Sequence, residues 1–579
     1  MALKPIRGRR RFRDFLVYDL EWVPGTLDVR MVGVFDGERY RYYSSVAAFL
    51  DHEIVRENRN RWFYAHAGGL ADIQFLLPHF YDNENYQIDG CFSGSSAIIV
   101  RVQKGKHSWT FCDSYWLLKD SLANIGKSVG MEKTGPNALD LQSTEEIKQW
   151  YASIDFKTLV EYNEIDLRIL YSAIERFQEE LYSLGGELQK TVASSAMNLF
   201  RRSYLKRPIY TNDAVNLEAR ESYFASRVEV FNSECHDGYY YDINSSFPFS
   251  MTFPVPGTYL GRVPRISESW LDDDSKPFFA HVDFTVPDCD LPPTPTRIAG
   301  RVFFPVGRWQ AFLSSIDIRL LFECGAIIHR VNKVRTFEPR SDLKEYVEDI
   351  YSRRKATDDP FRRLVYKYLL NSLYGKFAER SEKETLLIHP ETTPSREYML
   401  TPGVFVVPKV ANVPHECVWI SSYITARSRY NLYHLMRQSK RYYYCDTDGF
   451  ASDTPDMTTS AELGGLKLEK VIHHGKFIAP KVYRLDGMVD GEEKTIVKAK
   501  GFSLGKGKEA IERFETLIGG HDIEVDRMAR IRENLRKGKV HPVETIVTKR
   551  LQNMMPKRHT YSDGSTRPYT IDELREVLS

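Results

Sequence analysis

Two aromatic runs that end in aspartates are the feature that most constrains the fold of this chain. Residues 239–242 read Tyr-Tyr-Tyr-Asp, and residues 442–449 read Tyr-Tyr-Tyr-Cys-Asp-Thr-Asp-Gly. Aromatic residues favour strands. The first run therefore predicts a strand that ends at Asp242, and the second predicts a β-hairpin with Asp446 and Asp448 at its turn.

A third segment, from residue 359 to residue 375, predicts a helix with one polar stripe. Asp359 and Pro360 supply an N-cap and a proline at the first helical position. Four side chains then recur at intervals of four, four and three residues, which places them on one helix face. These residues are Arg363, Lys367, Asn371 and Tyr374.

These residue types suit nucleotide transfer, an in-line phosphoryl transfer in which two divalent ions bridge the attacking oxygen, the α-phosphate and the leaving pyrophosphate. Carboxylates favour hard ions such as Mg²⁺ or Mn²⁺. We expect Asp242 and Asp448 to hold both ions, with Ile243 among the metal-binding residues and Asp446 as a further catalytic acid. Lys367 can neutralise the triphosphate and assist the leaving group.

The other predicted nucleotide-binding residues lie close to these acids or on the same helix. Phe247, five residues after Asp242, can pack against the sugar and exclude a 2′-hydroxyl. Asn371 and Tyr374 would face the incoming nucleotide and the nascent base pair. Ser246 completes the predicted nucleotide-binding set.

A second group of acids lies in the first third of the chain. Residues 15–21 predict a strand, and Asp19 and Glu21 alternate along it, so both carboxylates share one face of the sheet. Asp72 follows a glycine-rich turn. Phosphodiester hydrolysis with two ions needs several acids that converge on ions about 3.5–4 Å apart.

A helix predicted over residues 156–177 completes this group. Tyr162 and Asp166 are four residues apart and therefore share one helix face. A tyrosine near the attacking water can orient it. We call Asp19, Glu21, Asp72, Tyr162 and Asp166 the nuclease set. Each short motif also occurs by chance, so the interpretation depends on their order and spacing together.

Taken together, these segments make the chain similar to the family B DNA polymerases, especially the subgroup that begins replication from a protein primer in bacteriophages, adenoviruses and linear plasmids. The family's DxxSLYPS motif corresponds to residues 242–249, and its KxxxNSxYG motif is intact at residues 367–375. Its YxDTDS motif corresponds to residues 444–449, and its KxY motif to residues 481–483. The three exonuclease motifs correspond to the nuclease set.

The resemblance implies further DNA-binding residues and several departures. Lys481 and Tyr483 would steady the primer terminus, Tyr223 matches a YxGG linker motif, and Lys133 is the candidate for a basic residue near the scissile phosphate. The departures are Phe247 for the usual tyrosine, Gly449 for the serine after Asp-Thr-Asp, and Ala67, Gly68 and Ala71 before Asp72. We therefore expect intact cleavage chemistry with altered binding of the single strand.

The resemblance also implies a multidomain α/β and α+β fold, with a ribonuclease H-like 3′→5′ exonuclease domain followed by a right-hand palm, fingers and thumb. The expected divisions are 1–188 for the exonuclease, 189–304 for the first part of the palm, 305–348 for a first insertion, 349–378 for the fingers, 379–417 for a second insertion, 418–518 for the second part of the palm, and 519–579 for the thumb. In the subgroup, the first insertion contacts the priming protein, and the second helps to enclose DNA and gives strand displacement.

Composition bounds the remaining expectations. The net charge is only +2, but basic residues cluster at 353–355 and between 527 and 558, where they can follow DNA phosphates. The seven cysteines include no CxxC pair, which argues against a zinc ribbon or a disulfide framework. No apolar run resembles a signal or a membrane span, so we expect a monomer in the cytoplasm.

The expected partners are a DNA template and primer, deoxynucleoside triphosphates and a terminal priming protein. Four alternatives stay open. The enzyme could extend DNA primers or start without any primer. It could instead be an exonuclease alone, or a non-catalytic replication scaffold, although no metal-binding acid is missing.

Overall fold

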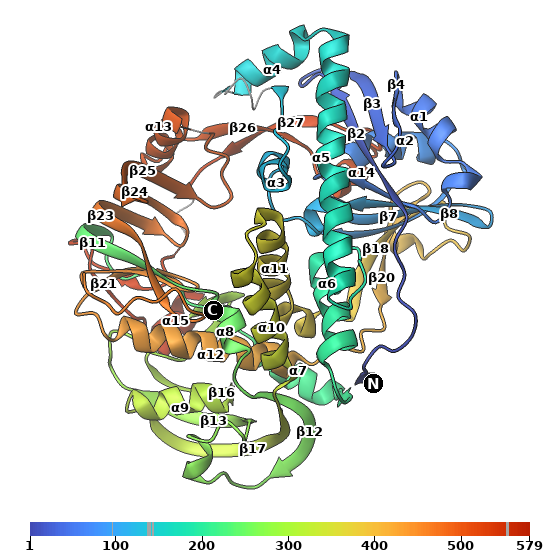
Figure 1. The fold of residues 1–579 in the computed structure, drawn as a ribbon. Coiled ribbons are helices and arrows are strands. Elements are labelled where there is room, and N and C mark those ends of the chain that lie inside the picture. The colour runs from blue at the N-terminus through green and yellow to red at the C-terminus, as the bar shows by residue number, and fades with distance from the viewer. Residues whose placement is uncertain (95, 136–140, 142–143, 506, 552–554, 579) are drawn as a thin grey trace.

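The computed structural model describes residues 1–94, 96–135, 141, 144–505, 507–551 and 555–578. Figure 1 shows these parts arranged as a ring. An N-terminal α/β part and a central sheet lie on opposite sides, and a lobe lies below them. None of the described helices is long and apolar enough to cross a membrane.

The N-terminal part is a mixed sheet covered by a long helix. Strands β2 (Phe15–Trp22), β5 (Trp62–Ala65) and β8 (His107–Asp113) run parallel to one another at its centre. Helix α5 (Phe156–Ser183) packs against β2, and its N-cap Asp155 accepts a hydrogen bond from the backbone N–H of Thr158 at 3.0 Å. The predicted strand and helix that carry the nuclease set are therefore confirmed.

Three strands from much later in the sequence extend this sheet. β18 (Glu382–Ile388) pairs antiparallel with β6 (Gln87–Ser93), and β20 (Val404–Val410) and β19 (Met399–Thr401) follow outward. The expected second insertion, 379–417, is thus built onto the nuclease part of the molecule.

The central sheet positions the aspartates of the aromatic runs. Its strand order is β10-β21-β22-β11-β23-β24-β25. The first aromatic run lies in β11 and the second forms the β21–β22 hairpin, so both predictions are confirmed. The strands are β10 (Val228–Val230), β11 (Glu234–Ile243), β21 (Tyr442–Asp446), β22 (Gly449–Ser452), β23 (Leu466–Ala479), β24 (Val482–Val489) and β25 (Glu492–Ala499).

The lower lobe is a four-stranded sheet in the order β12-β17-β13-β16. The expected division at residue 305 falls inside this sheet, because β13 pairs with both β16 and β17. We therefore move the proposed start of the first insertion to residue 255. The strands are β12 (Val255–Val263), β13 (Phe278–Val286), β16 (Gly307–Ser314) and β17 (Ile327–Arg340), with α9 (Ser315–Glu323) beside them.

A helical hairpin stands at the ring opening in Figure 1. It consists of α10 (Asp342–Ala356) and α11 (Pro360–Ser372). Asp359 caps α11 by accepting hydrogen bonds from the backbone N–H groups of Phe361 at 2.9 Å and Arg362 at 3.2 Å. The predicted cap and helix are confirmed.

A two-stranded ribbon closes the ring. β26 (Ile523–Met528) and β27 (Glu544–Lys549) pair after α13 (Gly507–Ile518), and α14 (Ile531–Arg536) lies between them in the sequence. The ribbon reaches the N-terminal part, where the side-chain amide of Gln74 donates to the Ala529 carbonyl at 3.0 Å.

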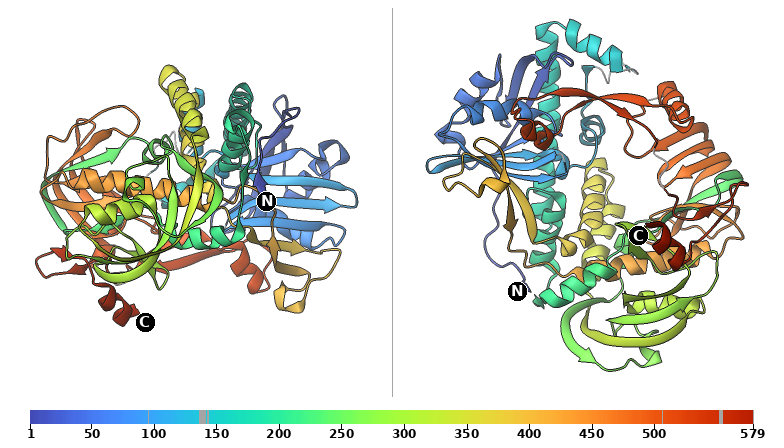
Figure 2. Two further views of the ribbon diagram at one scale, coloured as in Figure 1. Left: turned by 90° about the horizontal axis from the view of Figure 1, so that it is seen from below. Right: turned by 180° about the vertical axis from the view of Figure 1, so that it is seen from behind.

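The last residues leave this ribbon and return to the lobe and central sheet, as Figure 2 shows from behind. Thr570 bridges to Val306, and Ser565 bridges to Asn232. Arg558 is buried against Asp290, so it cannot face duplex phosphates as its position in a basic tail suggested. The expected thumb of 519–579 is therefore wrong for residues 555–578.

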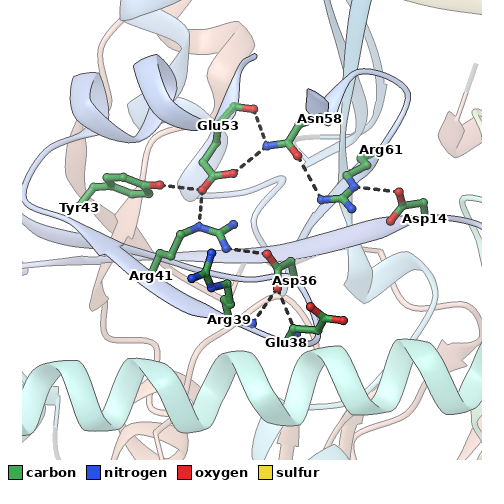
Figure 3. Close-up of polar contacts among 9 residues, drawn as sticks. All are labelled: Asp14, Asp36, Glu38, Arg39, Arg41, Tyr43, Glu53, Asn58 and Arg61. Atoms are coloured by element: carbon green, nitrogen blue, oxygen red, sulfur yellow. Dashed lines mark hydrogen bonds and ion pairs between the residues drawn. The ribbon is translucent and has the colours of Figure 1, made fainter. Parts of the chain in front are cut away.

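A polar network ties the outer edge of the N-terminal sheet together (Figure 3). The buried carboxylate of Glu53, at the end of α1 (Val46–Glu53), accepts hydrogen bonds from Arg41 at 2.9 Å, Tyr43 at 2.7 Å and Asn58 at 2.8 Å. Full pairing of a buried charge is what makes its burial tolerable. The network fixes the edge strand β4 (Tyr40–Tyr43).

Candidate active sites

The β11 end and the β21–β22 turn bring Asp242 and Asp448 to one pocket. Asp242 is the cross-strand partner of Gly449, and the backbone N–H of Ile243 donates to the Asp448 carbonyl at 2.9 Å. Both side chains line a cavity of about 780 Å³ together with Lys367 and Asn371 of α11. We call this cavity the central pocket.

The two acids of the central pocket repel each other. Burial, and then the charges of Asp242 and Asp446, raise the pKa of Asp448 to about 7. Burial, and then the charge of Glu469, raise the pKa of Asp242 to about 6. Crowded, partly desolvated carboxylates favour either a proton or a bound cation.

The third acid of the hairpin has a different environment. Asp446 forms an ion pair with Lys481, and the Thr447 hydroxyl donates to it at 3.2 Å. It does not line the central pocket. Asp446 therefore has a cationic partner of its own, although its charge still raises the pKa of Asp448 and of Asp242.

The wall opposite the acids is cationic. Lys367 and Asn371 are exposed, and Arg354 of α10 is half-buried. Among the described residues, none of these three side chains has a hydrogen bond or an ion pair. Sequence reasoning did not select Arg354, although it noted the basic run 353–355 that contains it.

The predicted sugar-facing residue is in contact with the predicted base-pair-facing residue. The rings of Phe247 and Tyr374 are stacked, with centroids 4.3 Å apart and an interplanar angle of 18°. Ser246 is buried, and its hydroxyl is 2.9 Å from that of Ser428. Its side chain thus points into the protein, while Ser245, with a φ of 56°, lines the pocket.

The predicted primer-side residues divide between surface and core. Lys481 lies in the β23–β24 turn and pairs with Asp446. Tyr483 is only 1% exposed and packs against Tyr444, with ring centroids 5.4 Å apart. Tyr223 follows α7 (Asp213–Ser222) and is half-buried. Contact of these residues with DNA stays a prediction.

In the nuclease set, one asparagine joins the two acids of β2. The side-chain amide of Asn163 donates to Asp19 and to Glu21, each at 3.2 Å. Burial raises the pKa of Glu21 to about 7, and burial with the charges of Glu21 and Asp72 raises that of Asp19. Asn163 was missed by sequence reasoning, although it directly follows Tyr162.

Asp72 begins α2 (Asp72–Tyr81) and accepts a hydrogen bond from the backbone N–H of Leu20 at 3.1 Å. Burial raises the pKa of Asp72 to about 7. Asp113, at the end of β8, is a further buried acid whose charge raises the pKa of Asp72. No motif in the sequence indicated Asp113.

The two nuclease-set residues of α5, Tyr162 and Asp166, both lie close to the ammonium group of Lys133. Asp166 forms an ion pair with Lys133, whose ammonium lies 5.0 Å from the Tyr162 ring centroid. The Tyr162 hydroxyl is 3.3 Å from that of Tyr151. The structure therefore places Lys133 within the nuclease set.

Both acid groups fit hard divalent cations. Their side-chain donors are carboxylate oxygens, which Mg²⁺ and Mn²⁺ prefer. The buried Oδ1 atom of Asp166 has no hydrogen-bond partner among the described residues. A buried unpaired carboxylate oxygen beside other carboxylates is suited to an ion.

The fold and these two acid sites define a class of proteins. Its members have a right-hand palm, fingers and thumb, preceded by a nuclease-type α/β domain. Solved structures show the same fold. Phi29 DNA polymerase superposes on 93% of this chain and 100% of its own with a TM-score of 0.71, at 16% identity. The expected fold class is confirmed.

Comparisons of the sequence point to the same kind of protein as the fold. Residues 140–424 match the family described as DNA polymerase type B, organellar and viral. A protein of Neurospora intermedia named "Probable DNA polymerase" is 30% identical over 410 residues, which cover 62% of this chain and 41% of that protein. The DNA-directed DNA polymerase of Enterobacteria phage PRD1 is 22% identical, with 82% of each chain covered.

Over residues 140–424, this chain is similar to the family B DNA polymerases of the organellar and viral type. It spans less than half the length of the fungal relatives that it matches.

Proposed function

We propose that this protein is a template-directed DNA polymerase that also carries a 3′→5′ exonuclease. The observation that supports the polymerase most is the central pocket, where Asp242 and Asp448 face Lys367 and Asn371 across one cavity. A related structure, that of phi29 DNA polymerase, was solved with primer-template DNA and incoming nucleotides. We propose the same partners here.

For synthesis, the residues of the central pocket have distinct roles. Asp242 and Asp448 would hold two Mg²⁺ or Mn²⁺ ions, which supply positive charge at the transferring phosphate and favour the attacking 3′-oxygen. Lys367 and Arg354 are free to bind the triphosphate oxygens. Phe247, stacked on Tyr374, closes the space that a ribose 2′-hydroxyl would need.

For hydrolysis, the acids of the nuclease set supply the metal ligands, and two neighbouring side chains hold these acids in place. Asn163 fixes the side chains of Asp19 and Glu21 by hydrogen bonds, and Lys133 fixes Asp166. Tyr162 lies beside Lys133, where its hydroxyl can orient an attacking water. Asp19, Glu21, Asp72 and Asp166 would hold Mg²⁺ or Mn²⁺ ions, as proposed for the central pocket.

Primer extension with Mg²⁺ on a primed template tests both activities. Wild type should extend the primer with nucleotides and degrade it without them. Asp242→Ala should lose extension and keep degradation, and Asp19→Ala should show the converse. Retention of extension in Asp242→Ala would refute the polymerase assignment, and loss of both activities in both variants would refute the division into two sites.

A second assay addresses sugar discrimination. Phe247→Val should raise the ratio of ribonucleotide to deoxyribonucleotide incorporation by about tenfold or more, because it opens a packed contact with the sugar. The matched control is Phe249→Val, two residues along, whose ring packs against Phe253. An unchanged ratio in Phe247→Val would assign the gate to another side chain.

We further propose protein-primed initiation with strand displacement. The similarity to the organellar and viral family B polymerases supports it, as do the lobe of residues 255–340 and the contact that closes the ring at Gln74 and Ala529. Copurification of a protein covalently linked to a first nucleotide would support such priming. Rolling-circle extension that stalls at the first duplex would contradict strand displacement.

A further inference from the structure

An exposed face of the central sheet carries two histidines and a glutamate, away from both acid sites. Among the described residues, Glu234, His236 and His474 are the one group of three histidine, cysteine or carboxylate side chains whose ligand atoms all lie within 4.8 Å of one another. We propose that this group, the histidine cluster, binds a divalent transition-metal ion such as Zn²⁺.

The strand register holds the cluster together. His236 of β11 is the direct cross-strand partner of His474 of β23, and their ring centroids are 5.0 Å apart. Glu234 lies two residues before His236 on the same strand, so its side chain projects from the same face. All three ligands therefore come from paired strands, which position side chains more firmly than loops do.

The distances match the spacing of ligands around one ion. The Nε2 atoms of His236 and His474 lie 3.8 Å and 3.6 Å from the same Oε2 atom of Glu234. Ligand bonds of about 2.0–2.2 Å at tetrahedral angles hold ligand atoms about 3.3–3.6 Å apart. Only a small movement of exposed side chains is needed to reach that geometry.

A carboxylate supports the ring of His474 from its other side. Asp486 of β24 is the cross-strand partner of His474, and its Oδ2 atom lies 3.9 Å from the Nδ1 atom. Metal-binding histidines commonly direct their second nitrogen toward a carboxylate, which orients the ring and raises its basicity. His474 would thus bind the ion through Nε2 and face Asp486 through Nδ1.

The ligand types select the class of ion. Two imidazoles and one carboxylate suit Zn²⁺, Cu²⁺ or Ni²⁺, whereas Mg²⁺ and Ca²⁺ prefer oxygen ligands alone. The three side chains are 44–69% exposed, which leaves a coordination position open to water. Lys476, the cross-strand partner of Glu234, makes no ion pair among the described residues, so it leaves the Glu234 carboxylate to the histidines.

An ion bound at the histidine cluster would link β11 to β23 in the central sheet. His236 is six residues before Asp242 on β11, or about 20 Å along the strand. An ion at the cluster would therefore stabilise the pairing of β11 with β23 without taking part in phosphoryl transfer. A ligand that binds only the folded state raises its stability.

Zinc titration of tag-free, full-length protein tests the proposal. Calorimetry in excess Mg²⁺ keeps the carboxylate sites filled with the harder ion. Wild type should bind one Zn²⁺ and gain thermal stability. His236→Ala and His474→Ala should each bind Zn²⁺ at least about tenfold more weakly, since loss of even a supporting residue has that effect.

The matched control is His473→Ala. His473 is exposed and adjacent to His474, but its Nδ1 atom lies 3.2 Å from Glu493 instead. This variant should bind Zn²⁺ like wild type. Absence of Zn²⁺ binding in the wild type would overturn the proposal. Zn²⁺ binding as tight in His236→Ala and His474→Ala as in wild type would also overturn it, because the ion would then bind elsewhere, such as at the active-site carboxylates.

Discussion

The nuclease set and the central pocket both gather aspartates, but they balance the charge differently. In the nuclease set, the protein supplies the partners: Lys133 pairs with Asp166, and Asn163 donates to Asp19 and Glu21. In the central pocket, Lys367 and Arg354 stand across a cavity from the acids and pair with no described residue.

This difference fits what each site would bind under the proposed function. Hydrolysis uses water and a strand end, so a nuclease site can be organised before the substrate arrives. Synthesis brings a highly charged triphosphate into the site, and unpaired cations on the facing wall are what such a substrate needs. The comparison predicts that charge substitutions will affect the two activities separately.

The largest effect should come from removing one charge of the central pocket. Asp448→Asn keeps the shape of the side chain but weakens a ligand worth several kcal/mol, so synthesis should fall about a thousandfold. Exonuclease activity should be unchanged. Single-nucleotide extension and degradation of a labelled primer measure the two rates. Asp456→Asn, an exposed aspartate outside the pocket, should behave like wild type.

The next largest effect should come from Lys133, the cation that pairs with Asp166 of the nuclease set. Lys133→Met removes a charge-assisted hydrogen bond to a buried carboxylate, worth about 1.5–3 kcal/mol, so hydrolysis should fall up to about a hundredfold. Synthesis should persist. Lys157→Met, on the exposed face of α5, is the control. Equal losses of both activities in Lys133→Met would contradict the separation of the two sites.

A smaller effect is expected from the cations of the central pocket, which are more exposed. Lys367→Met and Arg354→Met should each raise the KM for nucleotide by about tenfold, because each loses one contact with phosphate. Arg362→Met on the same hairpin, where Arg362 pairs with Glu180 at 3.1 Å, should leave KM unchanged. A KM that is unaffected in both pocket variants would remove them from the triphosphate site.

Local patterns predicted the ligand-bearing elements of both sites. The aromatic run predicted the end of β11 to within one residue, at Asp242 instead of Ile243, and Asp359-Pro360 predicted where α11 begins. Such signals act within a few residues and therefore can be read from sequence. Arg354 and Asp113 lack a motif, and only the folded chain shows that they face the sites.

Long-range pairing was not predictable in the same way. β18 joins β6 across nearly three hundred residues of sequence, and the segment from residue 555 returns to the lobe. Nothing in the local pattern of a strand names its partner, since any half-buried strand offers the same backbone groups. The insertion and thumb divisions were misplaced for this reason.

The last prediction concerns pH, and it applies to the central pocket without bound ions. With pKa values of about 7 for Asp448 and about 6 for Asp242, protons compete with Mg²⁺ below neutrality. These folded-state values lie above the ordinary value of 3.8, so both groups favour the ion-free fold at low pH and oppose it as pH rises toward 7.

The Mg²⁺ concentration that half-saturates synthesis should therefore rise as pH falls from 7 to 5, by at most about tenfold per pH unit for each proton displaced. In the nuclease set, burial raises the pKa of Asp19, Glu21 and Asp166, and the charge of Lys133 offsets part of that rise. Lys133→Met should then move the acid limb of hydrolysis to higher pH and leave that of synthesis in place. Parallel shifts of both limbs would mean that the two sites share one titrating group, which their separate environments do not allow.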